Sequence, residues 1–208
     1  MITHDFKLFF VHIPKCAGRS VCDMFNQRFD HYTAAYLQRE YETFWNNYKK
    51  FTIVRNPYDR LVSLYHYIRD HRRHANERIA VDNPMPTFRQ WLKINIENYM
   101  GDFSFSSAEG YRGSDGNLGS SFWFSSQFRR ISDANGKIIV DHIFKLDNGT
   151  QEIEDFLQSI THISAKMPHS NKSEYPDFLE FYDDKTIALA SSFIPIQEDC
   201  LKLGYQLL

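Results

Sequence analysis

LFFVHIPKCAGRS, residues 8–20, joins an apolar run, a loop and the start of a helix, and it is the most informative segment of this chain. It begins with an apolar run that favours a buried β-strand, and the residues from Ser20 onward have the spacing of a helix. Between them lies a loop with a cation, Lys15, and a hydroxyl, Ser20, close to the helix start. The first N–H groups of a helix lack partners within the helix and carry a partial positive charge, so they bind anions. This stretch therefore predicts an anion-binding loop.

A second stretch, FTIVRNPYDRLVS at residues 51–63, repeats the arrangement. An apolar run predicts a strand, Arg55 supplies the cation, and Ser63 supplies a hydroxyl in the helix that follows. Pro57 suits the first turn of that helix, because the N–H that proline lacks would have no partner there. Two such loops in one chain predict a ligand that carries two separate anionic groups.

Neither a Walker A loop nor a metal site is predicted. The Walker A motif, G-x-x-x-x-G-K-[ST], places its lysine after the glycines, whereas Lys15 precedes Gly18 in this chain. The cysteines are Cys16, Cys22 and Cys200, which are widely spread and show no CxxC or Cys/His metal spacing. This pattern indicates neither a disulfide framework nor a zinc site.

The two loops carry a resemblance to a known family. Residues 14–20 resemble the 5′-phosphosulfate loop of sulfotransferases that use 3′-phosphoadenosine 5′-phosphosulfate (PAPS), and residues 55–63 resemble their 3′-phosphate site. The chain is most similar to the carbohydrate branch, which includes the heparan sulfate 2-O-sulfotransferases and short bacterial relatives. Further segments agree in order along nearly the whole chain, namely Gln127, residues 141–147, residues 168–173 and residues 203–205.

The resemblance implies an α/β fold of the P-loop-NTPase-like type. It would be a three-layer domain with a central parallel sheet of about four to five strands, flanked by helices. The length of the chain suits one such sulfotransferase domain over residues 1–208. The alternation of predicted strands and helices agrees with a parallel sheet.

The resemblance also assigns a nucleotide site to this sequence. Lys15 would lie beside the bridging oxygen of the phosphosulfate, where negative charge builds as the sulfuryl group leaves. Arg55 and Ser63 would bind the 3′-phosphate. Lys172 and Ser173 would either reach the same phosphate or belong to an ordinary polar loop. The expected nucleotide-binding residues are Lys15, Cys16, Ala17, Gly18, Arg19, Ser20, Arg55, Ser63, Lys172 and Ser173.

The general base does not follow from the resemblance. Heparan sulfate 2-O-sulfotransferases carry a catalytic histidine in a region where this chain has none, since no histidine occurs between His74 and His142. A base must lie within hydrogen-bond reach of the acceptor hydroxyl, and histidine is the usual choice. Three candidates remain: His66 on nearly the same helix face as Ser63, His12 at the end of the first strand, and Glu109.

The rest of the chain predicts further elements. Residues 100–121 are rich in Gly and Ser and predict a long loop. Asn135-Gly136 predicts a tight turn. The sequence favours helices at 20–29, from an N-cap at Thr87 to about Asn98, at 151–160 and at 184–203 with a break near Pro195, and strands at 32–37 and 138–146.

The charge and the apolar runs of the chain argue against a nucleic-acid partner and against a membrane span. The net charge of −2 argues against a nucleic-acid partner. The first strand begins close to Met1 and no apolar run approaches the ~20 residues of a membrane span, so a cytoplasmic enzyme is expected. A basic cluster at a helix end is either a solvated face or a landing site for an anionic glycan; it comprises Arg69, His71, Arg72, Arg73, His74 and Arg78.

These observations predict a metal-independent enzyme that moves a sulfuryl group from PAPS to a hydroxyl of an acceptor, which the resemblance implies to be a carbohydrate. One alternative is a kinase of similar fold, which would need Mg²⁺-ATP and a carboxylate to hold the metal. Another is a module that binds a nucleotide or a glycan and transfers nothing. The sequence leaves both alternatives open.

Overall fold

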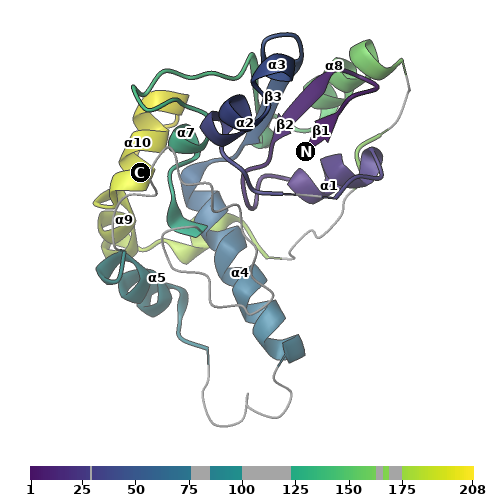
Figure 1. Cartoon of the computed structure of the whole chain (residues 1–208). Helices are drawn as coiled ribbons and strands as arrows, with labels where there is room; N and C mark the ends of the chain where they lie inside the picture. The colour runs from purple at the N-terminus through teal and green to yellow at the C-terminus, as the bar shows by residue number, and fades with distance from the viewer. Residues whose placement is uncertain (29, 76–84, 100–122, 163–165, 169–174) are drawn as a thin grey trace.

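A computed structural model describes residues 1–28, 30–75, 85–99, 123–162, 166–168 and 175–208. The chain forms an α/β structure in which helices flank a four-stranded sheet (Figure 1). The strands are β1 (Ile2–Thr3), β2 (Leu8–Val11), β3 (Lys49–Val54) and β4 (His142–Lys145). The helical segments are α1 (Gly18–Met24), α2 (Ala34–Glu40), α3 (Glu42–Trp45), α4 (Pro57–Ala75), α5 (Phe88–Glu97), α7 (Gln127–Arg130), η1 (Leu146–Asn148), α8 (Gln151–Thr161), η2 (Phe178–Phe181), α9 (Asp184–Ser191) and α10 (Ile194–Leu203).

The sheet has the order β1-β2-β3-β4, and its three longer strands are parallel. Phe10 pairs with Phe51, and Val54 pairs with Lys145, while the short β1 is antiparallel to β2. The predicted parallel sheet is therefore confirmed, with an antiparallel edge strand that the sequence did not suggest. Because the three parallel strands end at one edge, the loops that follow them gather there.

Helices cover both faces of the sheet. Successive residues of a strand point to opposite faces, and the aromatic contacts of β2 and β3 show this clearly. The Phe9 ring packs against Trp45 of α3, with centroids 5.1 Å apart. Phe10 stacks on Phe51, whose ring in turn packs 5.4 Å from Phe156 of α8. β2 is a continuous apolar run and residues 51–54 of β3 are mostly apolar, because both faces of the sheet are buried there.

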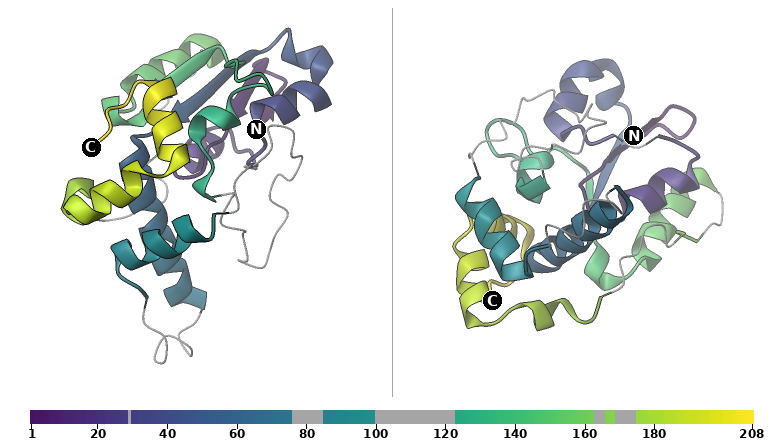
Figure 2. Two further views of the ribbon diagram at one scale, coloured as in Figure 1. Left: turned by 90° about the vertical axis from the view of Figure 1, so that its left-hand side faces the viewer. Right: turned by 90° about the horizontal axis from the view of Figure 1, so that it is seen from below.

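A second hydrophobic cluster surrounds α4. This long helix leaves the sheet at the end of β3, and α5, α10 and η2 pack against it, while α9 packs on α5 and α10 (Figures 1 and 2). The cluster includes Leu61 and Leu64 of α4, Trp91 of α5, and Ile196 of α10. The apolar face of α4 is thus the face that packs here. Among the described residues, no helix is both long and apolar enough to cross a membrane.

Several predicted elements are confirmed. The Thr87 side chain accepts a hydrogen bond from the N–H of Gln90, and a reciprocal bond from Thr87 N–H to the Gln90 side chain completes a capping box for α5. The break near Pro195 separates α9 from α10. Gly136 has a φ of 75°, as the predicted turn at Asn135-Gly136 requires.

Other boundaries were wrong. Residues 32–37 do not form a strand, because the Thr33 hydroxyl accepts a hydrogen bond from the N–H of Tyr36 and caps α2. The first predicted helix, 20–29, instead begins at Gly18 and ends at Met24. Only the last part of the predicted strand 138–146 pairs with β3, while Ile138 forms an isolated bridge with Ser132 across the turn.

Candidate functional site

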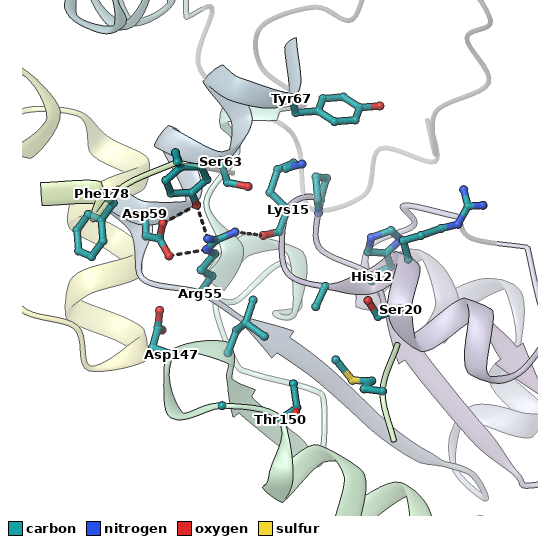
Figure 3. Close-up of a pocket in the computed structure, with 18 of the residues that line it drawn as sticks. His12, Lys15, Ser20, Arg55, Asp59, Ser63, Tyr67, Asp147, Thr150 and Phe178 are labelled. Carbon is teal, nitrogen blue, oxygen red and sulfur yellow. Dashed lines mark hydrogen bonds and ion pairs between the residues drawn. The ribbon is translucent and has the colours of Figure 1, made fainter. Parts of the chain in front are cut away.

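A cavity of about 960 Å³ lies at the edge of the sheet where the parallel strands end (Figure 3). The loop after β2, the start of α4 and the segment after β4 each contribute to its walls. The described lining also includes His31, Trp123, residues 167–168 and residues 175–178. In a parallel α/β sheet, ligands bind at this edge. The topology therefore brings the two predicted anion loops into one site.

The first loop has an unusual backbone. Lys15 and Ala17 have positive φ values of 69° and 55°, in the left-handed region that residues other than glycine rarely adopt. Left-handed residues next to ordinary ones turn successive N–H groups toward one side and form a concave anion site. Cys16 lies between them, but its N–H bonds to the Ile13 carbonyl and its Sγ donates to Gln127 Oε1 at 3.3 Å. Cys16 therefore faces the core of the protein.

Lys15 projects into the cavity. Its Nζ lies 4.3 Å from the centroid of the Tyr67 ring, which is a cation–π distance (Figure 3). Burial and the nearby Arg55 cation lower the pKa of Lys15 to about 8. A bound anion would reverse this shift, since it would stabilise the ammonium form. The side chain is thus suited to a ligand with negative charge.

Gly18 is required by its contact with His12. A Cβ atom at Gly18 would lie 1.8 Å from His12 Cδ2, which is far inside van der Waals contact. The His12 ring is 6% exposed and stacks near Phe10, and the His31 ring lies 4.3 Å from it. Burial lowers the pKa of His12 well below its usual range and that of His31 to about 3. Both rings line the cavity as neutral imidazoles.

Arg55 lies beside Lys15 in the cavity wall. Its Nε donates to Asp59 Oδ2 at 2.7 Å, its Nη1 donates to the Lys15 carbonyl at 3.2 Å, and its Nη2 donates to the Tyr175 hydroxyl (Figure 3). Ser63, two turns further along α4, lines the same cavity. The cation and the hydroxyl of the second predicted loop therefore face one space.

The start of α4 does not offer its backbone N–H groups to a ligand, so the prediction of a second backbone anion site was wrong. Asn56 N–H donates to the Asp147 carboxylate at 2.9 Å. The Asn56 side chain accepts from the N–H groups of Tyr58 and Asp59 at 3.0 and 3.5 Å, and Pro57 has no N–H. These donors are already used by the protein. The second loop can bind an anion only through side chains such as Arg55 and Ser63.

Gln127 joins the two loops. This side chain is fully buried, and its Oε1 accepts from Cys16 Sγ and from Arg55 N–H at 2.9 Å. Its Nε2 donates to the Arg55 carbonyl at 2.8 Å and to buried Asp199 at 3.0 Å. One amide thus fixes both the cysteine of the first loop and the backbone of Arg55. The place of Gln127 in the family resemblance has a structural reason.

Most residues predicted for the site come together. The cavity lining includes His12, Lys15, Ala17, Gly18, Arg19, Ser20, Arg55 and Ser63. Arg19 also forms an ion pair with Asp23 at 3.0 Å. Within the described part of the chain, Cys16 and His66 lie outside this lining. Glu109, Lys172, Ser173 and Arg78 fall outside the described residues, as does the predicted loop 100–121.

Several residues of the site were not predicted, and four of them bear on its chemistry. Asp59 stands four positions after Arg55, which is the spacing of a helical ion pair, so this contact was readable from the sequence. Tyr67 follows Ser63 by one helical turn, so it lies on the same face of α4 and also lines the cavity. His31 and Tyr175 carry no local signal, because they reach the cavity only through long-range packing.

Comparison with known proteins gives one finding. The family model described as "Sulfotransferase family" matches residues 1–187 of this chain. No curated protein and no solved structure matches it.

Proposed function

Because the chain belongs to the sulfotransferase family, we propose that it transfers a sulfuryl group from PAPS to a hydroxyl group of an acceptor. One observation carries the proposal: a single cavity is lined by Lys15 with its left-handed loop and, beside them, by Arg55 and Ser63. PAPS carries a 5′-phosphosulfate and a 3′-phosphate on one ribose. Two separate cationic positions in one cavity fit such a ligand.

The residues present fit the nucleotide in charge and in hydrogen-bonding groups. The loop from Ala17 to Ser20 would hold the 5′-phosphate through N–H groups and a hydroxyl. Arg55 and Ser63 would hold the 3′-phosphate as charge-assisted and hydroxyl donors. We also propose Lys172 and Ser173 for the 3′-phosphate, on the resemblance of residues 168–173 alone.

Lys15 is the residue to which we assign the main catalytic role. PAPS, when bound, supplies an activated sulfuryl group. Catalysis of such a transfer depends mainly on positioning and on stabilising the charge of the leaving group. An ammonium group in a partly buried site serves this purpose, because its field is weakly screened there. The pKa of about 8 places the group where a bound anion keeps it protonated.

For the general base we propose a histidine of the His12–His31 pair. Burial lowers the pKa of both rings, so both are neutral in the free protein, but the same shift weakens them as bases. The proposal therefore rests on their place in the cavity wall, and it requires that the negative charge of the bound nucleotide raise the pKa of the ring that accepts the proton. His12 was predicted from the sequence, and the pocket adds His31 beside it. His66 ranks below them as a base, since its ring stacks on Tyr175 and lies outside the described lining.

We propose a carbohydrate as the acceptor. The family resemblance points to the carbohydrate branch, and the Tyr67 and Trp123 rings lie 5.6 Å apart on the cavity wall near Lys15. Aromatic side chains present large apolar faces on which a sugar ring can pack. A phenolic or lipid hydroxyl would use the same faces and is therefore part of the test.

The test is a transfer assay with sulfur-labelled PAPS against a panel of glycans, lipids and small phenols. We expect label to pass to at least one glycan, and we expect the Lys15→Ala variant to lose this activity. Transfer to phenols alone would reject the carbohydrate acceptor. Transfer of the γ-phosphate of ATP in place of the sulfuryl group would reject the proposed reaction.

A further inference from the structure

Tyr175 closes a ring of hydrogen bonds with Arg55 and Asp59. Its hydroxyl accepts from Arg55 Nη2 and donates to Asp59 Oδ1 at 2.8 Å. Asp59 Oδ2 accepts from Arg55 Nε at 2.7 Å, which completes the ring (Figure 3). Arg55 lies in the loop between β3 and α4, and Asp59 lies in the first turn of α4, whereas Tyr175 comes from a segment more than a hundred positions later. The contact therefore joins two distant parts of the chain.

The hydrogen bonds to Arg55 fix its guanidinium group before any ligand binds. An arginine has five N–H donors. Among the described residues, one donor each from Nε, Nη1 and Nη2 bonds to Asp59, the Lys15 carbonyl and Tyr175. These contacts leave one donor on Nη1 and one on Nη2 for a ligand. A side chain held in one orientation loses less conformational entropy when it binds its ligand.

The Tyr175 ring is itself held by aromatic packing. It stacks on His66 with centroids 4.9 Å apart and an interplanar angle of 18°, and Phe181 meets it edge-on at 6.3 Å. His66 is only 3% exposed, and neither of its ring nitrogens has a hydrogen-bond partner among the described residues. Its contacts are those of a packing residue. His66 thus supports Tyr175, although the sequence suggested a base.

Charge explains why the hydroxyl matters. The Asp59 carboxylate is negative and lies beside the place proposed for a phosphate, so by itself it would repel that ligand. Arg55 Nε and the Tyr175 hydroxyl donate to its two oxygens, one to each. Burial and the Asp59 charge raise the pKa of Tyr175 to about 12, so the hydroxyl keeps its proton.

We propose that Tyr175 is a positioning residue that fixes Arg55 for the 3′-phosphate and thereby favours 3′-phosphorylated nucleotides. This inference rests on the proposed function and adds to it a residue outside the two loops. Without the hydroxyl, Arg55 would retain Asp59 and the Lys15 carbonyl but would lose its restraint at Nη2. The Asp59 carboxylate would also lose one of its two donors.

The test is calorimetric binding of two nucleotides, adenosine 3′,5′-bisphosphate and adenosine 5′-monophosphate, to the whole chain. Tyr175→Phe removes the hydroxyl and keeps the ring. We expect it to weaken bisphosphate binding about three- to tenfold, the scale of one intramolecular hydrogen bond, and to leave monophosphate binding unchanged. The matched control is Tyr182→Phe, which removes a buried hydroxyl that bonds to the Tyr58 carbonyl. This control should preserve both affinities.

A double-mutant cycle separates positioning from folding. In an Arg55→Ala background, Tyr175→Phe should have no further effect on bisphosphate affinity, because Tyr175 acts through Arg55. An equal loss for both nucleotides, an additive loss in that background, or full affinity in the single variant would overturn the inference. If the unmodified protein itself fails to prefer the bisphosphate, the proposed 3′-phosphate site fails, and the role of Tyr175 fails with it.

Discussion

Arg55 Nη1 donates a hydrogen bond to the backbone carbonyl of Lys15 at 3.2 Å, so the cation of the second loop holds the backbone of the first. Gln127 adds a second link, since its amide bonds to Cys16 and to both backbone groups of Arg55. The two predicted anion-binding loops are therefore joined to each other by hydrogen bonds. A substitution in either loop has to be tested for effects on the other.

Arg55→Ala should weaken binding of adenosine 3′,5′-bisphosphate by roughly 1.5–3 kcal/mol, the usual contribution of a charge-assisted hydrogen bond. Its effect on adenosine 5′-phosphosulfate, which lacks the 3′ group, should be much smaller. Titration calorimetry with both ligands measures the difference. Equal losses would mean that Arg55 acts mainly by holding the Lys15 carbonyl, and the assignment to the 3′-phosphate would be wrong.

Lys15→Ala should reduce turnover by about two to three orders of magnitude, the range for a lost oxyanion donor. The charge on the leaving oxygen develops only in the transition state, so binding of the bisphosphate product should fall much less. Lys15→Arg should rescue activity only in part, because a planar guanidinium does not replace a compact ammonium. Turnover and product affinity are measured on the same preparations. Near-normal turnover in Lys15→Ala, or a loss confined to affinity, would contradict this role.

Nucleotide affinity should depend on pH through Lys15. Its pKa in the folded protein is about 8, below the ordinary lysine value, so the free protein loses this charge as the pH rises through 8. An anionic ligand prefers the protonated form. Affinity for the bisphosphate should therefore be greatest below pH 8 and should decline between about pH 8 and pH 9.5. Lys15→Met should flatten that decline, and a decline of the same size in Lys15→Met would assign it to another group.

Gly18→Ala should destabilise the protein, because its methyl group would overlap the His12 ring. Overpacking of a buried site costs about 1–3 kcal/mol, measured by urea denaturation. The matched variant is Gly18→Ala in a His12→Ala background, where the space left by the ring should accept the methyl group. Additive losses in the double variant would show that the contact with His12 is not what excludes a side chain.

The sequence predicted those parts of the fold whose signals are local. The apolar runs before Lys15 and before Arg55 form buried parallel strands, and the capping pattern at Thr87 begins a helix. Residues 32–37 were mistaken for a strand because Tyr and Leu also suit strands, whereas the Thr33 cap decides for a helix. Short segments of this kind depend on their tertiary surroundings.

The two loops of the candidate site were predictable from the sequence, whereas the residues that hold them in place through long-range contacts were not. Lys15 and Arg55 stand at strand ends and were readable from the chain, and the cavity lining contains both. The sequence did not indicate that backbone N–H groups at the start of α4 are already hydrogen-bonded within the protein, since the Asp147 carboxylate that binds Asn56 N–H comes from a distant segment. Tyr175 was missed for the same reason. Nothing in the residues around it indicates that it meets Arg55 and Asp59.

Titration calorimetry in the presence of EDTA tests whether this chain binds a 3′-phosphorylated adenosine nucleotide without a metal. Adenosine 3′,5′-bisphosphate should bind at least tenfold more tightly than ADP or ATP, a ratio that corresponds to about 1.4 kcal/mol. The same ratio should persist when EDTA is replaced by Mg²⁺. Equal or tighter binding of ATP, with a strict requirement for Mg²⁺, would contradict the account and favour a kinase.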